Sequence, residues 1–196
     1  YDGLSNMMTL GLEKRLNKKA VKFLDVQPGD LVLDVGCATG NAALEASLFC
    51  DPEKGGVIGL DAAPSMIKKA RSKIIHTPCR FDIGVAESLP YRDETFEKAI
   101  STFFFHHLNR DDKSKALNEI WRILKPSGLF VLCDLDFPYT LFGKIYGGLA
   151  ETFFRQPEIG ENLHGLFKNL LYQGPFKNVK CLGQYGGCFS IYRMEK

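Results

Sequence analysis

The feature that most restricts the fold of this chain is a short apolar strand that runs straight into a glycine loop. Residues 31–35 read LVLDV, an apolar run with one acid that is typical of a buried strand. The loop GCATG at 36–40 follows at once, and NAALEASLFC at 41–50 has the composition of a helix. A strand, a tight glycine loop and a helix in this order begin a βαβ unit, the building block of parallel sheets.

The same alternation continues along the chain. Four further apolar runs predict strands, at 57–60, 79–86, 96–102 and 129–135. Two β-like runs at 176–183 and 187–194 flank QYGG and indicate a C-terminal antiparallel pair. We therefore expect an α/β fold with a doubly wound, mostly parallel sheet and helices on both of its faces.

The segments between and beyond these strands are predicted to be helical. An N-terminal helical segment is expected within 1–26, and KPSG at 125–128 should end the helix that precedes the last parallel strand. Residues 137–172 are expected to be mostly helical, with interruptions near Pro157 and Gly160.

Composition excludes several classes of protein. The formal net charge is +2 over 196 residues, so no basic stripe for nucleic acid is expected. None of the six cysteines forms a CxxC pair or has zinc spacing with histidine, which favours buried free thiols in a reducing cytoplasm and no metal site. No apolar run is long enough to span a membrane. Without a Pro-, Ser- or Gly-rich linker, one domain over 1–196 is the simplest organisation.

The glycine loop also predicts the chemistry of its ligand. The dinucleotide fingerprint is Gly-x-Gly-x-x-Gly, but Ala38 and Asn41 occupy its second and third glycine positions, and the P-loop lysine is missing. Asp34 beside the loop would repel a pyrophosphate but attract an ammonium or a sulfonium. Asp61 ends the next strand, where a carboxylate can accept both ribose hydroxyls. S-adenosylmethionine carries all of these groups and no phosphate.

These motifs resemble those of the class I S-adenosylmethionine-dependent methyltransferases. The match reads VLDVGCATG, VIGLDAAPSMIKKA, GVAESLPYRDETFEKAISTFFFHHL and LNEIWRILKPSGLFVLCDLD, in that order, over residues 31–136. The resemblance implies the seven-stranded Rossmann-like methyltransferase fold with a C-terminal antiparallel strand. It also implies methyltransferase activity with S-adenosylmethionine as the cofactor.

The resemblance further implies which residues hold the cofactor. Asp34 would bind the methionine amino group, Asp61 would bind the ribose, and the backbone from Gly36 to Gly40 would approach the methionine part. Met66 would pack near the adenine, and the backbone of Ala86 would read its edge. The remaining cofactor-binding residues that we expect are Cys37, Ala38, Ala62, Glu87 and Ser101.

Two positions depart from the family pattern. Val85 stands where the family often has an Asp that accepts the adenine amino group, so Glu87 or Asp82 are the alternatives for this contact. Ala38 occupies a loop position where the family usually has glycine. We expect it to narrow the loop only slightly, because alanine tolerates most backbone angles outside the left-handed region.

Both ends of the chain also resemble the ubiquinone/menaquinone biosynthesis C-methyltransferases, through YDGLSNMMTLGLEKRLNKKAVKFL at the start and GGCFSIYRMEK at the end. The segment after the fourth strand differs, because FFFHHL replaces the Gly, Arg and Asn of that family. We expect His106 to act as the general base, the alternative being a structural histidine, whereas His107 is expected to be structural.

The acceptor is therefore expected to be a small, apolar or aromatic molecule, with C-methylation of a quinol-like ring as the leading specific expectation. N- or O-methylation of another metabolite and non-catalytic binding of S-adenosylmethionine remain open alternatives. Nucleic acid is disfavoured as a partner because no Pro-Pro-aromatic motif follows the fourth strand. Contact with a membrane is expected to be peripheral at most, through the stretch at 134–154, and the oligomeric state stays open.

Overall fold

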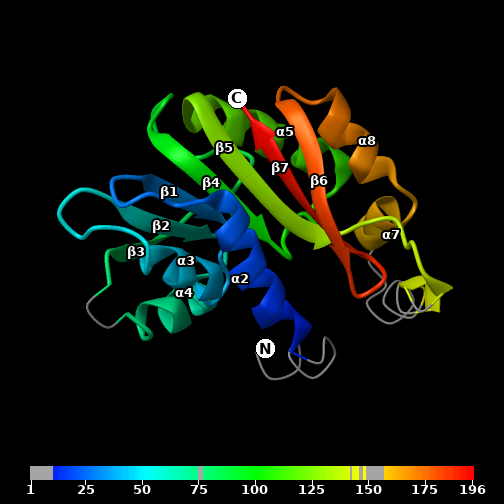
Figure 1. Cartoon of the computed structure of the whole chain (residues 1–196), viewed down its shortest axis with the longest axis horizontal. Helices are drawn as coiled ribbons and strands as arrows, with labels where there is room; N and C mark the ends of the chain where they lie inside the picture. The colour runs from blue at the N-terminus through cyan, green and yellow to red at the C-terminus, as the bar shows by residue number, and fades with distance from the viewer. Residues whose placement is uncertain (1–10, 75–76, 142, 146–147, 149–156) are drawn as a thin grey trace.

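The chain builds one seven-stranded sheet, which confirms the expected α/β class (Figure 1). The structure is a computed structural model that describes residues 11–74, 77–141, 143–145, 148 and 157–196. The strands lie in the order β3-β2-β1-β4-β5-β7-β6. Their bounds are β1 Leu31–Val35, β2 Gly56–Asp61, β3 Cys79–Ile83, β4 Phe96–Thr102, β5 Leu124–Leu135, β6 Lys177–Tyr185 and β7 Phe189–Glu195.

Strand direction places the chemistry at one edge of this sheet. Strands β1 to β5 are parallel to one another, while β7 pairs antiparallel with both β5 and β6. The predicted C-terminal antiparallel pair is thereby confirmed. Because the carboxyl ends of β1 to β5 meet at the same edge, the residues that follow them come together there.

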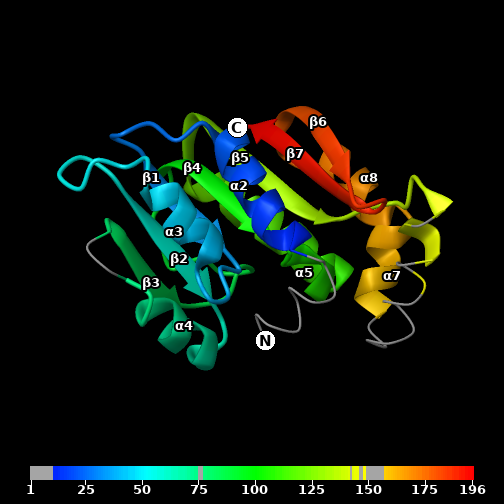
Figure 2. The ribbon, with the colours of Figure 1, turned by 60° about the horizontal axis from the view of Figure 1, so that its bottom comes forward.

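Helices cover both faces of the sheet (Figures 1 and 2). Helices α2, α3 and α4 share one apolar core with the sheet, and α5 and α8 pack in a second core on the opposite face. The helical bounds are α2 Leu12–Leu24, α3 Asn41–Ser47, α4 Pro64–Arg71, the 3-10 turn η1 Phe105–His107, α5 Arg110–Ile123, α7 Pro157–Leu163 and α8 Leu166–Gln173.

Local chemistry explains where α4 and α5 begin. Pro64 occupies the start of α4, where its missing N–H leaves no hydrogen bond unmade. The side chain of Asn109 caps α5 by accepting a hydrogen bond from the backbone N–H of Asp112 at 3.0 Å. Capping satisfies one of the donors at the helix start that would otherwise lack a partner.

The structure corrects two predicted breaks. Strand β5 begins at Leu124 rather than 129, because Leu124 pairs with Phe96 before KPSG bulges out and pairing resumes between Leu129 and Lys98. Gly160 lies inside α7 and interrupts nothing. The interruption comes at Gly165, whose φ of 77° lies in the left-handed region that glycine adopts without strain.

Some predictions fall outside the described residues. Residues 1–10 of the expected N-terminal helical segment lie there, as do four aromatic residues of the 137–172 segment, namely Phe142, Tyr146, Phe153 and Phe154. The single domain over 1–196 stays a prediction. Within the part of the chain that the structure describes, no helix is long and apolar enough to cross a membrane. All six cysteines are free. Five of them are buried, as expected, whereas Cys181 is exposed.

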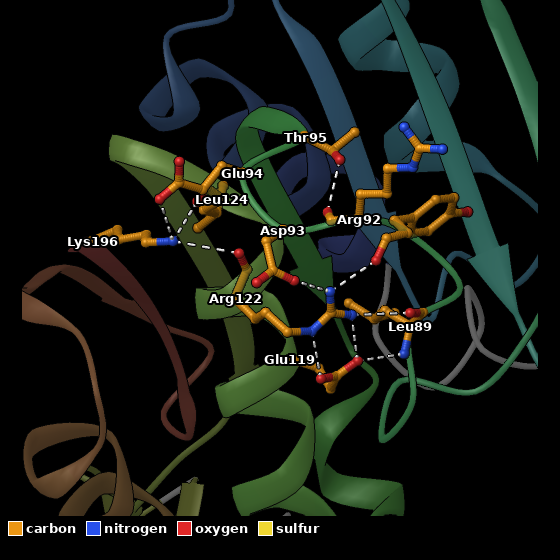
Figure 3. A network of polar contacts seen from close by, with 10 residues as sticks. Leu89, Arg92, Asp93, Glu94, Thr95, Glu119, Arg122, Leu124 and Lys196 are labelled. Atoms are coloured by element: carbon orange, nitrogen blue, oxygen red, sulfur yellow. Dashed lines mark hydrogen bonds and ion pairs between the residues drawn. The ribbon is translucent and has the colours of Figure 1, made fainter.

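The amino-terminal edge of the sheet is braced by Arg122, near the end of α5 (Figure 3). Its guanidinium donates two parallel hydrogen bonds of 2.8 Å to the carboxylate of Glu119. It also donates to Asp93 at 2.7 Å and to the carbonyls of Tyr91 and Leu89, at 2.8 and 3.0 Å. Arg122 therefore fastens the segment that enters β4 to α5.

Candidate active site

The glycine loop after β1 is held by backbone hydrogen bonds and by close packing. The backbone N–H groups of Gly36 and Cys37 both donate to the carbonyl of Leu60 in β2, at 2.9 and 3.0 Å. Gly36 and Gly40 adopt φ angles of 72° and 80°. A Cβ on Gly40 would lie 2.4 Å from the ring of Phe81, so both conformation and space require glycine there.

Ala38 adopts a conformation that the sequence did not predict. Its φ of 44° lies in the left-handed region, outside the angles that alanine tolerates easily. An L-residue there places its Cβ close to the following carbonyl, at a cost of ~1–2 kcal/mol. Ala38 therefore carries backbone strain that glycine would not, and its small effect on the width of the loop stays a prediction.

Asp61 at the end of β2 braces this loop. One carboxylate oxygen accepts the backbone N–H of Ala38 at 2.9 Å, and the other accepts that of Ala63 at 2.8 Å. Each oxygen has a second lone pair, so the carboxylate can still accept two hydroxyl groups. The sequence predicted only a ribose contact and missed the bracing role, which depends on backbone groups on both sides of the strand end.

Asp34 in β1 is buried and unpaired. Its exposed fraction is 1%, and neither carboxylate oxygen has a hydrogen-bond partner among the described residues. Burial, together with the nearby negative charge of Asp61, raises the pKa of Asp34 to about 7, although the amide of Ala43 acts the other way. A buried carboxylate without a partner is costly on its own and fits a cationic ligand group.

The remaining predicted cofactor residues lie around the ends of β2, β3 and β4, in different environments. Met66 and Glu87 are half-buried, Ala62 is exposed, and Ala86 is buried. Ser101 is fully buried, and its hydroxyl donates to the carbonyl of Val35 at 2.8 Å, so its side chain ties β4 to β1.

The residues considered for the adenine contact differ in whether their side chains have a free hydrogen-bond acceptor. Val85 is 45% exposed and offers no polar atom. The carboxylate of Asp82 accepts the hydroxyl of Tyr91 at 3.0 Å and faces Arg80 at 3.7 Å. Asp82 is therefore engaged on β3, whereas no hydrogen bond from the chain engages Glu87 in the described part.

A second cluster lies at the carboxyl ends of β4 and β5 and is centred on Asp134. One oxygen of this buried carboxylate accepts the backbone N–H groups of Phe104 and Phe105, at 3.1 and 2.7 Å. The other accepts the N–H of Leu135 at 2.7 Å and lies 2.6 Å from Nδ1 of His106. Burial alone would raise the pKa of Asp134, but His106, the Leu135 amide and the nearby His107 outweigh it and lower the pKa.

From the sequence, Asp134 and Asp136 follow the fifth strand, where they could orient an acceptor or be ordinary strand-end carboxylates near solvent. Asp134 is 2% exposed, so it does not lie near solvent. The available signal was strand order, because β4 and β5 are consecutive parallel strands whose carboxyl ends must be neighbours. Asp136 is also buried and accepts the hydroxyls of Ser190 and Tyr192, both at 2.6 Å.

The two histidines of η1 differ in their surroundings. The side chain of His106 is 12% exposed and faces Asp134, whereas His107 is exposed. Their rings lie with centroids 4.0 Å apart. His106 is thus held at the end of β4 by a carboxylate, a contact that both a general base and a structural histidine could make.

The three phenylalanines that precede these histidines have separate roles. Phe105 belongs to the core, where its ring stacks on Phe167 with centroids 5.3 Å apart. Phe103 adopts a φ of 56° and meets Phe189 edge-on at 5.5 Å. Phe104 packs against Gly36, where a Cβ would lie 2.1 Å from its ring. The three rings therefore pack against the core, against β7 and against the glycine loop, respectively.

The sequence matches those of known methyltransferases. Residues 32–128 match the family described as methyltransferase domain. The chain is 31% identical to a demethylmenaquinone methyltransferase of Desulfitobacterium hafniense, over 78% of this chain and 67% of that protein. It is 30% identical to the ubiquinone/menaquinone biosynthesis C-methyltransferase UbiE of Geotalea daltonii, over 100% of this chain and 91% of that protein.

The fold has a counterpart among solved structures. A crystal structure of an S-adenosylmethionine-dependent methyltransferase from Thermotoga maritima superposes with a TM-score of 0.70 at 21% identity, covering 100% of this chain and 95% of that one. The likeness at this identity concerns the fold, and the sequence relatives supply the family. The chain therefore belongs to the class I S-adenosylmethionine-dependent methyltransferases, within the methyltransferase domain family.

Proposed function

We propose that this enzyme methylates a small, apolar or aromatic acceptor, and that the specific reaction is C-methylation of a quinol-like ring. The observation that carries the proposal is His106, fixed at the carboxyl end of β4 by Asp134 and preceded in the chain by three phenylalanines. The two relatives reported above, whose names specify quinone methylation, support the choice of ring.

We propose that the cofactor lies over the loop after β1. S-adenosylmethionine supplies an electrophilic methyl group on a positively charged sulfur. Asp34, buried without a partner, would face the ammonium group of the methionine part, and the free lone pairs of Asp61 would accept the ribose hydroxyls. Met66, Ala86 and neighbouring residues would surround the adenine.

The protein contributes orientation, exclusion of water and one proton transfer. A ring hydroxyl must lose its proton before the adjacent carbon becomes nucleophilic, and an imidazole near neutral pH is suited to accept it. His106 is our candidate for this base. The displacement itself needs alignment rather than a further reactive side chain, which explains why the sequence carries no separate catalytic motif.

A labelled-methyl assay tests the acceptor. Purified protein with methyl-labelled S-adenosylmethionine would be offered a short-tailed naphthohydroquinone lacking the ring methyl, a biogenic amine, a catechol, a basic peptide and a single-stranded oligonucleotide. We expect the label on a ring carbon of the hydroquinone. Transfer to nitrogen or oxygen of a small molecule would reject the C-methylation, and preference for the peptide or oligonucleotide would reject the small-molecule acceptor as well.

His106→Gln tests the base, with the neighbouring His107→Gln as a matched control. We expect His106→Gln to lower turnover by ~10²–10⁴ while the affinity for S-adenosylmethionine stays nearly intact. His107→Gln should retain most of the turnover. Equal losses of cofactor binding and turnover in His106→Gln would indicate a structural role for this histidine instead.

Two measurements together distinguish an enzyme from a non-catalytic protein that only binds S-adenosylmethionine. Binding of S-adenosylmethionine in a calorimeter without transfer to any component of a metabolite extract would favour a binding protein.

The six free thiols support a reducing compartment, and we propose that the enzyme acts in the cytoplasm.

A further inference from the structure

We infer that Asp134 is a positioning residue that fixes the tautomer of His106, so that Nδ1 carries the proton and Nε2 is left bare to accept one from the acceptor. The tautomer follows from the hydrogen bonds around Asp134. Only the use of Nε2 as a base rests on the proposed function.

The backbone hydrogen bonds to Asp134 leave only one lone pair that could hold a proton, the one that faces Nδ1 of His106. One oxygen accepts two backbone N–H groups, and the other accepts a third from Leu135. A backbone N–H can only donate, so these three contacts favour the ionised carboxylate. The lowered pKa of Asp134 is consistent with this state.

An ionised carboxylate can only accept, so the imidazole nitrogen 2.6 Å away must donate. That nitrogen is Nδ1 of His106. A neutral imidazole carries one proton, and therefore Nε2 is the acceptor in the neutral ring. The tautomer is thus set by Asp134 and, at one remove, by the backbone amides that keep Asp134 ionised.

The pair is also held rigidly. The side chain of Asp134 is 2% exposed and that of His106 is 12% exposed, so bulk water has little access to the bond between them. The amides of Phe104 and Phe105 anchor the segment that carries His106, and Phe105 is fixed in the core against Phe167. The ring therefore holds its orientation before the acceptor arrives.

The proton transfer balances without a further reagent. The O–H bond of the ring hydroxyl breaks, its electron pair stays with the ring oxygen, and the proton bonds to the lone pair of Nε2. His106 becomes an imidazolium with both nitrogens protonated. Asp134 stays ionised and stabilises that charge, and no proton passes to it.

Nitrogen NMR of the free protein tests the tautomer directly. The chain has four histidines, so protein labelled with ¹⁵N only in histidine gives a simple spectrum that His106→Gln would assign. We expect the neutral ring of His106 to show a protonated Nδ1 and a bare Nε2. A neutral ring protonated on Nε2 would overturn the inference, whatever the enzyme methylates.

Asp134→Asn tests the functional consequence, with Asp136→Asn as a control that is also buried, at 5% exposed, but accepts two hydroxyls and only one backbone N–H. An amide in place of the carboxylate can donate to Nδ1 and favour the opposite tautomer. We expect turnover with the hydroquinone to fall by ~10²–10⁴, with the KM for S-adenosylmethionine little changed. Asp136→Asn should change turnover far less.

The outcomes separate the two proposals. If the Nδ1-protonated tautomer is found but no hydroquinone is methylated, the positioning role stands and the proposed function fails. If Asp134→Asn is folded and retains full turnover, the positioning role fails while the methylation stands. Should Asp134→Asn fail to fold, the tautomer of the unmodified protein decides the question by itself.

Discussion

Asp34 and Asp134 lie in strands of the same sheet, both almost without exposed surface, yet the protein treats them in opposite ways. Asp34 has no hydrogen-bond partner among the described residues, and its pKa is raised to about 7. Asp134 accepts three backbone N–H groups and pairs with His106, and its pKa is lowered. The difference teaches that the β4–β5 end is assembled by the chain itself, whereas the β1 end leaves a buried carboxylate that the chain does not pair.

The largest effect on stability is expected from breaking the paired end. Asp134→Ala removes the acceptor of three amides and leaves a histidine facing a cavity. Breaking a buried pair of this kind costs ~3–5 kcal/mol in free energy of unfolding. Urea unfolding followed by circular dichroism would measure it, with Asp111→Ala in the exposed first turn of α5 as control, expected below ~1 kcal/mol. Similar losses in both variants would contradict the assignment of Asp134 as the centre of the cluster.

At the β1 end, replacing the buried acid Asp34 should stabilise the ligand-free protein, whereas replacing Asp134 should destabilise it. Because the pKa of Asp34 is about 7 in the folded chain and its ordinary value is 3.8, the folded state holds a proton that the unfolded state releases. Stability is therefore full below about pH 4, falls as the pH rises, and levels off above about pH 7. Asp34→Asn removes this dependence, and we expect it to stabilise the ligand-free protein at pH 8 by ~2–4 kcal/mol.

The same variant should weaken binding of S-adenosylmethionine, because it removes the carboxylate that we propose to face the ammonium group of the cofactor. Chemical unfolding at pH 4, 6 and 8, with and without the cofactor, measures both effects. An unmodified protein as stable at pH 8 as at pH 4, relative to Asp34→Asn, would show that Asp34 has a partner or is hydrated.

A smaller effect is expected at Asp61, which is partly paired and so stands between the two extremes. Asp61→Asn leaves one acceptor oxygen in place of two, so one bracing amide and one proposed ribose contact are lost. We expect the affinity for S-adenosylmethionine to fall by ~1–3 kcal/mol in calorimetry. Asp51→Asn, in the turn before β2, is the control and should bind normally. Unchanged affinity in Asp61→Asn would place the ribose elsewhere.

The smallest effect concerns Ala38. Ala38→Gly relieves the strain of a φ of 44°, but the freer unfolded chain offsets part of the gain, so we expect a net stabilisation of at most ~1 kcal/mol. Affinity for the cofactor should change by less than about tenfold. Ala46→Gly inside α3 is the same substitution in a right-handed helix and should destabilise by ~1 kcal/mol. Equal losses of stability in Ala38→Gly and Ala46→Gly would mean that Ala38 is unstrained.

Much of the fold was predictable because its signals are local. The bounds of β1 at 31–35 and of β4 at 96–102 were predicted as observed, since a short apolar run between turn residues identifies a buried strand. The start of β5 was missed because Leu124 pairs with Phe96 across the sheet, and no neighbour in sequence indicates that pairing. The left-handed conformation of Ala38 was missed for a similar reason, because Asp61 holds its amide from another strand.

The sequence by itself determined the parallel sheet, the glycine loop and the preference for S-adenosylmethionine, because strand periodicity, loop spacing and the acids at strand ends are properties of neighbouring residues. Only the tertiary structure decided which acids are paired. Ala38 and Asp61 are 23 positions apart in the chain, and His106 and Asp134 are 28 apart. Burial and hydrogen bonding between such distant positions decide the pKa of each carboxylate, and hence which one the chain leaves unpaired and which one it pairs with a histidine.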